Sequence, residues 1–320
     1  MRVRFPTSLV ALLDGGFGML LLSTGSLYTR PLRQVFAWAA EAGFEGMELL
    51  VDAREETRDL EKVRRYMEES GLPVPVVHMP FHSKRTPEWG RGSVERVLAT
   101  ARLAKELGAG LVVLHLPLWH EHRFASWLRE ELPGAERELG LTLAVENLPA
   151  NRWLLPGLRI RRWPFLFRER RRPSALSRLL LPVTRPDKRF NTAEELATFE
   201  HVVFDTCHWA ARGDVFAVWE ALKGRVVHIH LANTAGTAEH RLPWDGETDL
   251  GRFLRKAKAD GYAGHLTAEL CPQALGDPAE DTVRRRLAET VQWFRRLGSS
   301  EPAGGGEDGA GLPRPQSGRG

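Results

Sequence analysis

The 320-residue chain has only two cysteines, Cys207 and Cys271, and no cluster of thiols. Two thiols cannot build the disulfide framework of a small secreted domain, so we expect a reducing, cytoplasmic compartment and interpret both cysteines as small core residues. No apolar run reaches the ~18–20 residues that a spanning helix needs, and no transmembrane segment is expected. The glycine-rich G-x-G-x-x-G turn of a dinucleotide-binding fold is also missing, since the first expected strand continues as STGSLY.

An excess of one charge is nearly absent as well, because 45 Lys and Arg face 41 Asp and Glu, a net charge of +4. The charge is unevenly distributed. Residues 151–190 contain twelve basic and two acidic residues, a net charge of +10, which leaves −6 for the remainder. This distribution argues against a nucleic-acid-binding protein with a uniformly basic surface, and it indicates an acidic body with one basic insert.

The two ends of the chain differ from its centre. Residues 1–18 imitate a signal peptide, but Asp14 and the following glycine pair interrupt the apolar stretch, so we interpret them as a leader whose order the sequence does not define. The tail, 299–320, is rich in Gly and Pro and is predicted to be disordered. The folded domain is therefore expected over residues 19–298.

Short apolar runs alternate with longer amphipathic segments throughout this domain. The expected strands are Met19–Ser23, Gly46–Val51, Val74–Met79, Leu111–Leu116, Leu141–Glu146, His201–Asp205, Val226–Leu231 and His265–Leu270. The expected helices are Leu32–Ala42, Gly92–Leu107, Phe124–Leu132, Ala193–Phe199, Val215–Leu222, Leu250–Ala259 and Pro278–Leu297. Eight strand–helix units in about 280 residues predict a single (β/α)₈ TIM barrel, with the basic insert after the fifth strand.

Ionisable residues gather at the carboxyl ends of the expected strands, which form the working face of such a barrel. They are Glu48, His78, His115, Glu146, Asp205, His208, His228, His230 and Glu269. Each one alone also has a structural interpretation, such as a hydrogen-bonded histidine at the barrel rim or a salt-bridge partner for Glu48. Buried carboxylates and imidazoles are costly without partners, and four strands that follow one another each supply one of them. The pattern therefore predicts a divalent metal site for Zn²⁺, Mn²⁺, Fe²⁺, Co²⁺ or Mg²⁺.

The strand-end segments AVENLP, FDTCHWAARGD, HIHLANTAG, HRLPWDGETDL and LTAEL, in this order, resemble the xylose-isomerase-like TIM barrels. STGSLY and GFEGMELLVD near the start are also similar to that family. The superfamily contains the sugar phosphate isomerases/epimerases and endonuclease IV. The resemblance covers about residues 19–297, apart from the insert.

The isomerase/epimerase branch implies a metal held by Glu146, Asp205, His230 and Glu269. It also implies that Glu146 and Glu269 act as general base and acid on a small sugar, sugar phosphate or keto-acid, through a metal-stabilised enediolate. His208 is expected to contact the substrate, together with His78, His115 and His240. A small-molecule, sugar-type substrate is the expected partner, and a homo-oligomer is compatible with the sequence.

The endonuclease IV branch implies a second interpretation, a metal-dependent phosphodiesterase for abasic DNA, in which His78 and His115 hold a second metal. Its third zinc uses the strand-six histidine and an Asp-x-His pair, and His240 and Leu242 stand at the positions of that pair. Leucine cannot coordinate, so one or two metals are expected rather than three. Trp244 stands where the isomerase branch often has glycine, which affects the substrate assignment.

The insert itself, 151–190, interleaves arginines with Trp153, Trp163, Phe165 and Phe167. Such a segment could clamp a phosphate, lie on an acidic partner, an anionic lipid or a nucleic-acid backbone, or simply be a solvated lid. A barrel that binds a ligand without turnover is the third functional hypothesis.

Overall fold

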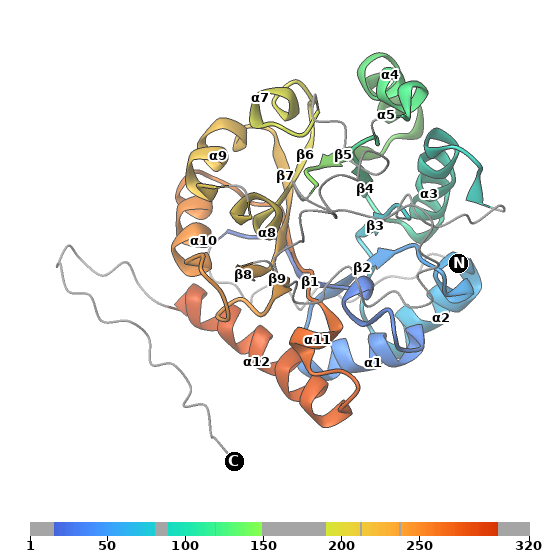
Figure 1. Cartoon of the computed structure of the whole chain (residues 1–320). Coiled ribbons are helices and arrows are strands. Elements are labelled where there is room, and N and C mark those ends of the chain that lie inside the picture. The colour runs from blue at the N-terminus through green and yellow to red at the C-terminus, as the bar shows by residue number, and fades with distance from the viewer. Residues whose placement is uncertain are drawn as a thin grey trace, which may run out of the picture.

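The computed structural model describes residues 16–80, 89–118, 120–148, 190–211, 213–236 and 238–299. Eight parallel strands close into a barrel in the order β1-β10-β7-β6-β5-β4-β3-β2, with helices around it (Figure 1). The strands are β1 (Leu20–Ser23), β2 (Gly46–Leu50), β3 (Val76–His78), β4 (Leu111–His115), β5 (Thr142–Glu146), β6 (Val202–Asp205), β7 (Val226–Leu231) and β10 (His265–Ala268). The predicted (β/α)₈ barrel is confirmed, and each expected strand contains one of these eight.

The helices and short turns follow the strands along the chain. They are η1 (Thr24–Leu27), α1 (Leu32–Ala42), η2 (Glu55–Arg58), α2 (Leu60–Ser70), α3 (Ser93–Leu107), α4 (His122–Glu130), α5 (Leu132–Leu139), α7 (Ala193–Leu196), α8 (Thr206–Ala210), α9 (Val215–Leu222), α10 (Leu250–Ala259), α11 (Pro272–Leu275) and α12 (Glu280–Ser299). None of the described helices is long and apolar enough to span a membrane.

Side chains alternate between two cores along each strand, because successive residues of a strand point to opposite faces. The outward residues, such as Val112, Val145 and Phe204, join the large apolar layer between the strands and the helices. The inward apolar residues form a smaller cluster inside the barrel: Leu21, Val76, Leu111, Val113, Ala144 and Val203. The inward positions that follow them toward the carboxyl ends are polar, so the alternation that builds the core also aims the ionisable residues into the barrel mouth.

Several elements were not expected from the sequence. Helix α2 has a weak apolar face and begins after Asp59, whose side chain accepts a hydrogen bond from Lys62 N. Helix α5, the five-residue α8 and the four-residue α11 were also missed, because such short elements leave little periodic signal. The last helix begins at Glu280 rather than at Pro278.

A small antiparallel hairpin, β8 (Asn233–Ala235) and β9 (Ala238–Arg241), occupies the segment after β7 that was expected to be a loop. The Asn233 side chain organises it, since Oδ1 accepts from Thr234 N and Thr248 N, and Nδ2 donates to the Pro243 carbonyl. Helix α8 packs against both hairpin strands and β7. The hairpin therefore brings a loop segment against the end of β6.

Candidate metal centre

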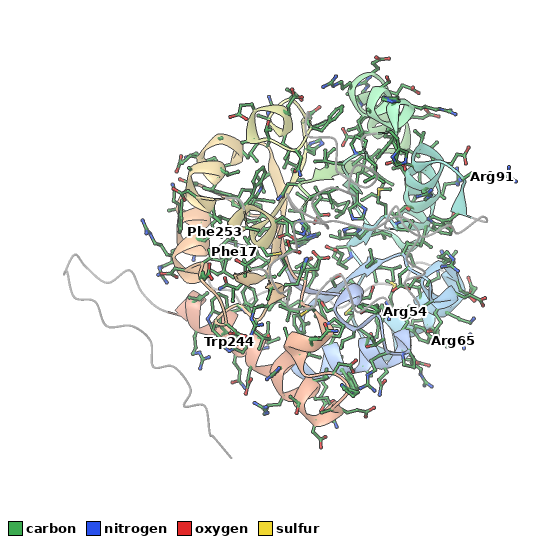
Figure 2. All side chains as sticks on the ribbon, in the orientation of Figure 1. Phe17, Arg54, Arg65, Arg91, Trp244 and Phe253 are labelled. Atoms are coloured by element: carbon green, nitrogen blue, oxygen red, sulfur yellow. The ribbon has the colours of Figure 1, made fainter. Side chains whose placement is uncertain are left out.

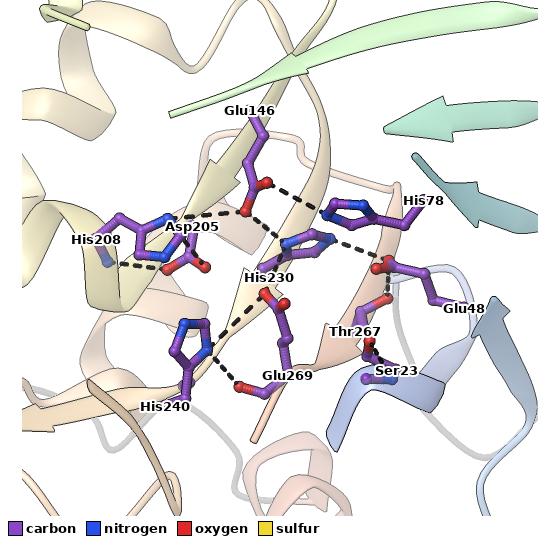
Figure 3. Close-up of polar contacts among 12 residues, drawn as sticks. Ser23, Glu48, His78, Glu146, Asp205, His208, His230, His240, Thr267 and Glu269 are labelled. Carbon is purple, nitrogen blue, oxygen red and sulfur yellow. Dashed lines mark hydrogen bonds and ion pairs between the residues drawn. The ribbon is translucent and has the colours of Figure 1, made fainter. Parts of the chain in front are cut away.

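Four ionisable side chains converge at the carboxyl ends of neighbouring strands. Glu146 ends β5, Asp205 ends β6, His230 lies on β7 and Glu269 directly follows β10 (Figure 3). One ligand atom from each lies within 4.8 Å of those of the other three. His230 Nδ1 is 3.0 Å from Glu146 Oε1 and 3.1 Å from Glu269 Oε2. The structure thus brings together the four residues for which the sequence predicted a shared metal.

The Asp205 carboxylate is held by the start of helix α8. Its Oδ1 accepts hydrogen bonds from Cys207 N at 2.7 Å and from His208 N at 2.9 Å, as an N-cap does. Its Oδ2 has no hydrogen-bond donor among the described residues, although it is completely buried. A buried carboxylate oxygen without a donor is costly, and a bound cation would remove that cost.

A second group of ligand atoms adjoins the first through Glu146. His78 Nε2 lies 3.3 Å and His115 Nε2 3.6 Å from Glu146 Oε2, while Glu146 Oε1 faces His230. His78 Nδ1 donates to the Met79 carbonyl, which leaves Nε2 as the nitrogen with a lone pair in a neutral ring. The two oxygens of one carboxylate therefore serve two adjacent groups of potential ligands.

His208 and His240 face each other beside Asp205, with ring centroids 5.2 Å apart. His208 Nδ1 donates to the Asn147 carbonyl and His240 Nδ1 to the Glu269 carbonyl, so both rings present Nε2. His240 has a positive φ of 55°, a conformation that non-glycine residues adopt at a cost. These two residues, Asp205 and Cys207 form a further group of possible ligands, to which the buried Leu242 adds none.

The cluster is electrostatically coupled. Burial alone would lower the pKa of His230, but the carboxylates of Glu48, Glu269 and Glu146 surround its ring and raise that pKa well above the usual value. Burial alone would raise the pKa of Glu146, and His230 and His78 hold it well below the usual value instead. Burial raises the pKa of Asp205. Protons and a divalent cation would compete for the same lone pairs, as they do in metal sites generally.

A deeper set of polar side chains lies next to this cluster and was not predicted as part of a site. It consists of Glu48 on β2, His228 on β7 and Thr267 on β10, all fully buried. Burial lowers the pKa of His228 to about 4, so this histidine is neutral near pH 7. The sequence signal was present, because all three residues occupy inward positions of their strands, but strand-end position was the criterion applied to the sequence.

The remaining expectations concern other parts of the chain. Cys207 and Cys271 are buried members of the core, as expected. Trp244 is partly buried and packs against the same core (Figure 2). Most of the basic insert, the beginning of the leader and the tail from residue 300 lie outside the described residues.

A closed parallel barrel with carboxylates and imidazoles at the carboxyl ends of its strands defines a class of TIM-barrel proteins with a metal-binding type of site. The family model that matches this chain, over residues 36–173 and 189–297, is the xylose isomerase-like TIM barrel. The chain belongs to this family, as its strand-end motifs indicated.

Individual proteins agree with this membership. The Mycobacterium tuberculosis (strain ATCC 25618 / H37Rv) protein Rv0498 is 26% identical over 285 residues, which cover 86% of this chain and 95% of that relative. Three solved structures share the fold. They are the IOLI protein with a binding zinc atom (TM-score 0.60, 16% identity, covering 89% of this chain and 100% of that one), a D-tagatose 3-epimerase-like protein (0.58, 16%, 88% and 97%) and endonuclease IV from Thermus thermophilus (0.50, 20%, 88% and 98%).

Proposed function

We propose that this protein is a metal-dependent isomerase or epimerase of a small sugar, sugar phosphate or keto-acid. The observation that carries the proposal is the placement of two carboxylates about one imidazole nitrogen. Glu146 and Glu269 approach His230 Nδ1 to 3.0 and 3.1 Å from strands on the two sides of β7. Carboxylates placed in this way can take a proton from a substrate carbon and return one to it.

The residues present fit a divalent cation. Glu146, Asp205, His230 and Glu269 would hold it, since they offer three carboxylates and one imidazole, and the buried Asp205 Oδ2 lacks a hydrogen-bond donor among the described residues. This donor set suits Mn²⁺, Zn²⁺, Co²⁺, Fe²⁺ or Mg²⁺. When bound, such an ion polarises a substrate carbonyl and so makes the hydrogens of the neighbouring carbon more acidic.

The chain's own groups would carry out the proton movements. Glu146 and Glu269 are ionised, because His230 lowers the pKa of both against the effect of burial, to about 2 for Glu269. Either one can therefore act as the base that removes a proton from carbon. His208 Nε2 has no hydrogen-bond partner among the described residues, so it is available to orient a substrate hydroxyl. Glu146 and Glu269 are at most 6% exposed, which limits access of bulk water.

The direct test is solvent isotope exchange. The full chain, loaded with Mn²⁺, Mg²⁺, Zn²⁺ or Co²⁺, is incubated in D₂O with a panel of ketoses, sugar phosphates and keto-acids. We expect deuterium to enter the carbon next to the carbonyl of at least one compound, and a chelator to stop this exchange. A protein that binds metal but exchanges no proton with any compound of the panel would contradict the proposal.

Replacing Asp205 with asparagine is expected to weaken metal binding with little change in the fold. The amide oxygen can still accept from Cys207 N and His208 N, but an NH₂ group replaces Oδ2. Loss of an outer-shell partner alone costs about 10–100-fold in metal affinity, and loss of a direct ligand should cost at least that much. The affinity is measured by competition with a chromophoric chelator.

The matched control is Asp214→Asn. Asp214 also caps a helix, accepting from Phe216 N at the start of α9, but it belongs to none of the groups of possible metal ligands among the described residues. Its substitution should leave the metal affinity unchanged. Equal affinities of the Asp205→Asn variant and the unmodified chain would remove Asp205 from the ligand set.

A second candidate function is a metal-dependent phosphodiesterase for abasic DNA, related to endonuclease IV. The observation in its favour is the group of His78, His115 and Glu146, whose ligand atoms lie within 4.8 Å of one another and share Glu146 with the first group. Phosphodiester hydrolases commonly use two or more adjacent metal ions. The buried Leu242, which supplies no ligand beside His240, argues against a complete three-metal site.

Counting metal and assaying DNA separate the two functions. One ion per chain and no DNA cleavage support the isomerase. More than one ion, loss of one ion in His115→Ala and chelator-sensitive incision of abasic-site DNA support the phosphodiesterase. Binding of compounds from the panel without exchange or incision would instead indicate a barrel that binds its ligand without turnover.

A further inference from the structure

The buried carboxylate of Glu48 makes an unusual set of contacts below the metal-ligand cluster. Its Oε2 accepts three hydrogen bonds: from His230 Nε2 at 3.0 Å, from His228 Nε2 at 3.0 Å and from Thr267 Oγ1 at 2.9 Å (Figure 3). Glu48, His228 and Thr267 are each 0% exposed. Three donors on one oxygen satisfy the charge of a carboxylate that water does not reach.

His230 differs from the other histidines of the site in how its ring is held. His78, His208 and His240 each donate Nδ1–H to a backbone carbonyl and present Nε2. His230 is held through Nε2 by Glu48 and presents Nδ1 to Glu146 and Glu269. A backbone carbonyl is a neutral acceptor, whereas Glu48 is a charged side chain. This difference singles out the one histidine that belongs to the four-residue group.

A neutral imidazole carries one proton, and the hydrogen bond made by one nitrogen decides which nitrogen has the lone pair. Glu48 can only accept when it is ionised, so it keeps the proton on Nε2 and leaves the lone pair on Nδ1. The anion also polarises the ring and makes Nδ1 a stronger donor to a cation. His228 and Thr267 fix Glu48 itself, because each bonds to the same oxygen and they also contact each other at 2.9 Å.

We propose that Glu48 is the positioning residue of the metal centre, which sets the tautomer and orientation of His230 so that Nδ1 is the ligand atom. This inference rests on the proposed metal-dependent function. Glu48 acts through His230 and is not itself a ligand, since its Oε2 bonds to the ring nitrogen that faces away from Glu146 and Glu269. The number of bound ions distinguishes the two roles, because removal of a positioning residue weakens an ion without eliminating its site.

The test compares metal binding by the full chain and by Glu48→Gln, which keeps the side-chain size and an oxygen acceptor but removes the charge. The probes are Zn²⁺ and Co²⁺ alone, measured by titration with a competing chelator. We expect a loss of affinity of about 10–100-fold with an unchanged number of ions per chain. Unloaded melting temperatures are recorded to show that the variants are folded.

Glu136→Gln is the matched control. Glu136 also pairs with a histidine, accepting from His201 Nδ1 at 2.8 Å and from Leu143 N at 2.7 Å, but at the amino ends of β5 and β6. Its metal affinity should equal that of the unmodified chain. Thr267→Val serves as a milder second variant should Glu48→Gln fail to fold; it removes one donor to Glu48 and is expected to lower the affinity about 2- to 10-fold.

The outcomes separate this inference from the proposed function. If the unmodified chain binds neither ion, the metal-dependent function and this inference both fail. If it binds metal and Glu48→Gln or Thr267→Val binds equally well, only the positioning role is overturned. A lower number of ions in Glu48→Gln would make Glu48 a ligand and overturn the positioning role as well.

Discussion

Replacing Glu269 with glutamine is expected to lower turnover, and proton exchange at the substrate carbon, by about 10²–10⁴-fold. Glutamine has nearly the same size but cannot accept a proton from carbon. The fold should persist, because the contact that Glu269 makes to His240 uses the backbone carbonyl, which the substitution leaves in place. Solvent deuterium exchange, at metal concentrations that saturate the variant, measures the effect.

Glu247→Gln is a suitable control for this substitution. Glu247 lies in the segment after the hairpin and accepts a hydrogen bond from Gly236 N, but it belongs to none of the groups of possible ligands among the described residues. Its exchange rate should match that of the unmodified chain. Exchange at the normal rate in a metal-loaded Glu269→Gln variant would disprove the acid–base role of Glu269.

Substitution of Phe253 with alanine is expected to lower the free energy of unfolding by about 3–5 kcal/mol. Phe253 on α10 is completely buried (Figure 2), with its ring centroid 5.4 Å from that of Phe204 on β6 and 5.3 Å from that of Trp219 on α9. Removing the ring leaves a cavity between three elements and abolishes both aromatic contacts. Denaturant unfolding monitored by circular dichroism measures the change.

Phe216→Ala is the comparison for that loss. Phe216 is only partly buried and contacts Phe253 from the edge of the same cluster, with centroids 6.2 Å apart, so its loss should cost clearly less. A reduction of less than about 1 kcal/mol in Phe253→Ala would show that this cluster is not a well-packed part of the core.

The regular part of the fold was predictable because its signals are local. Strands buried on both faces are apolar throughout, and the helices α1, α9 and α10 were expected with the bounds that the structure has. The elements that were missed depend on contacts between distant residues. The β8–β9 hairpin requires Asn233 to bond with Thr248, 15 positions further along the chain. No periodic pattern in either segment carries that information.

The candidate site was predictable to the same extent. The position of Glu146, Asp205, His230 and Glu269 at strand ends indicated one shared site, because parallel strands present their carboxyl ends at one face of a barrel. The sequence did not predict that the two oxygens of Glu146 face two different groups. It also left Glu48 with a salt bridge as its structural interpretation, and the partners proved to be His228 and His230.

The sequence by itself determined the barrel and the set of ionisable residues in its mouth, since both follow from which residues alternate along each strand. Only the tertiary structure decided which nitrogen of each histidine points to the site and which residues lie one level deeper. The physical reason is the stagger of a closed barrel, which sets Glu48 level with Val76 on one neighbouring strand and Asp205 level with His230 on another pair. Residues far apart in sequence thereby meet at hydrogen-bonding distance, and those contacts fix the imidazole orientations.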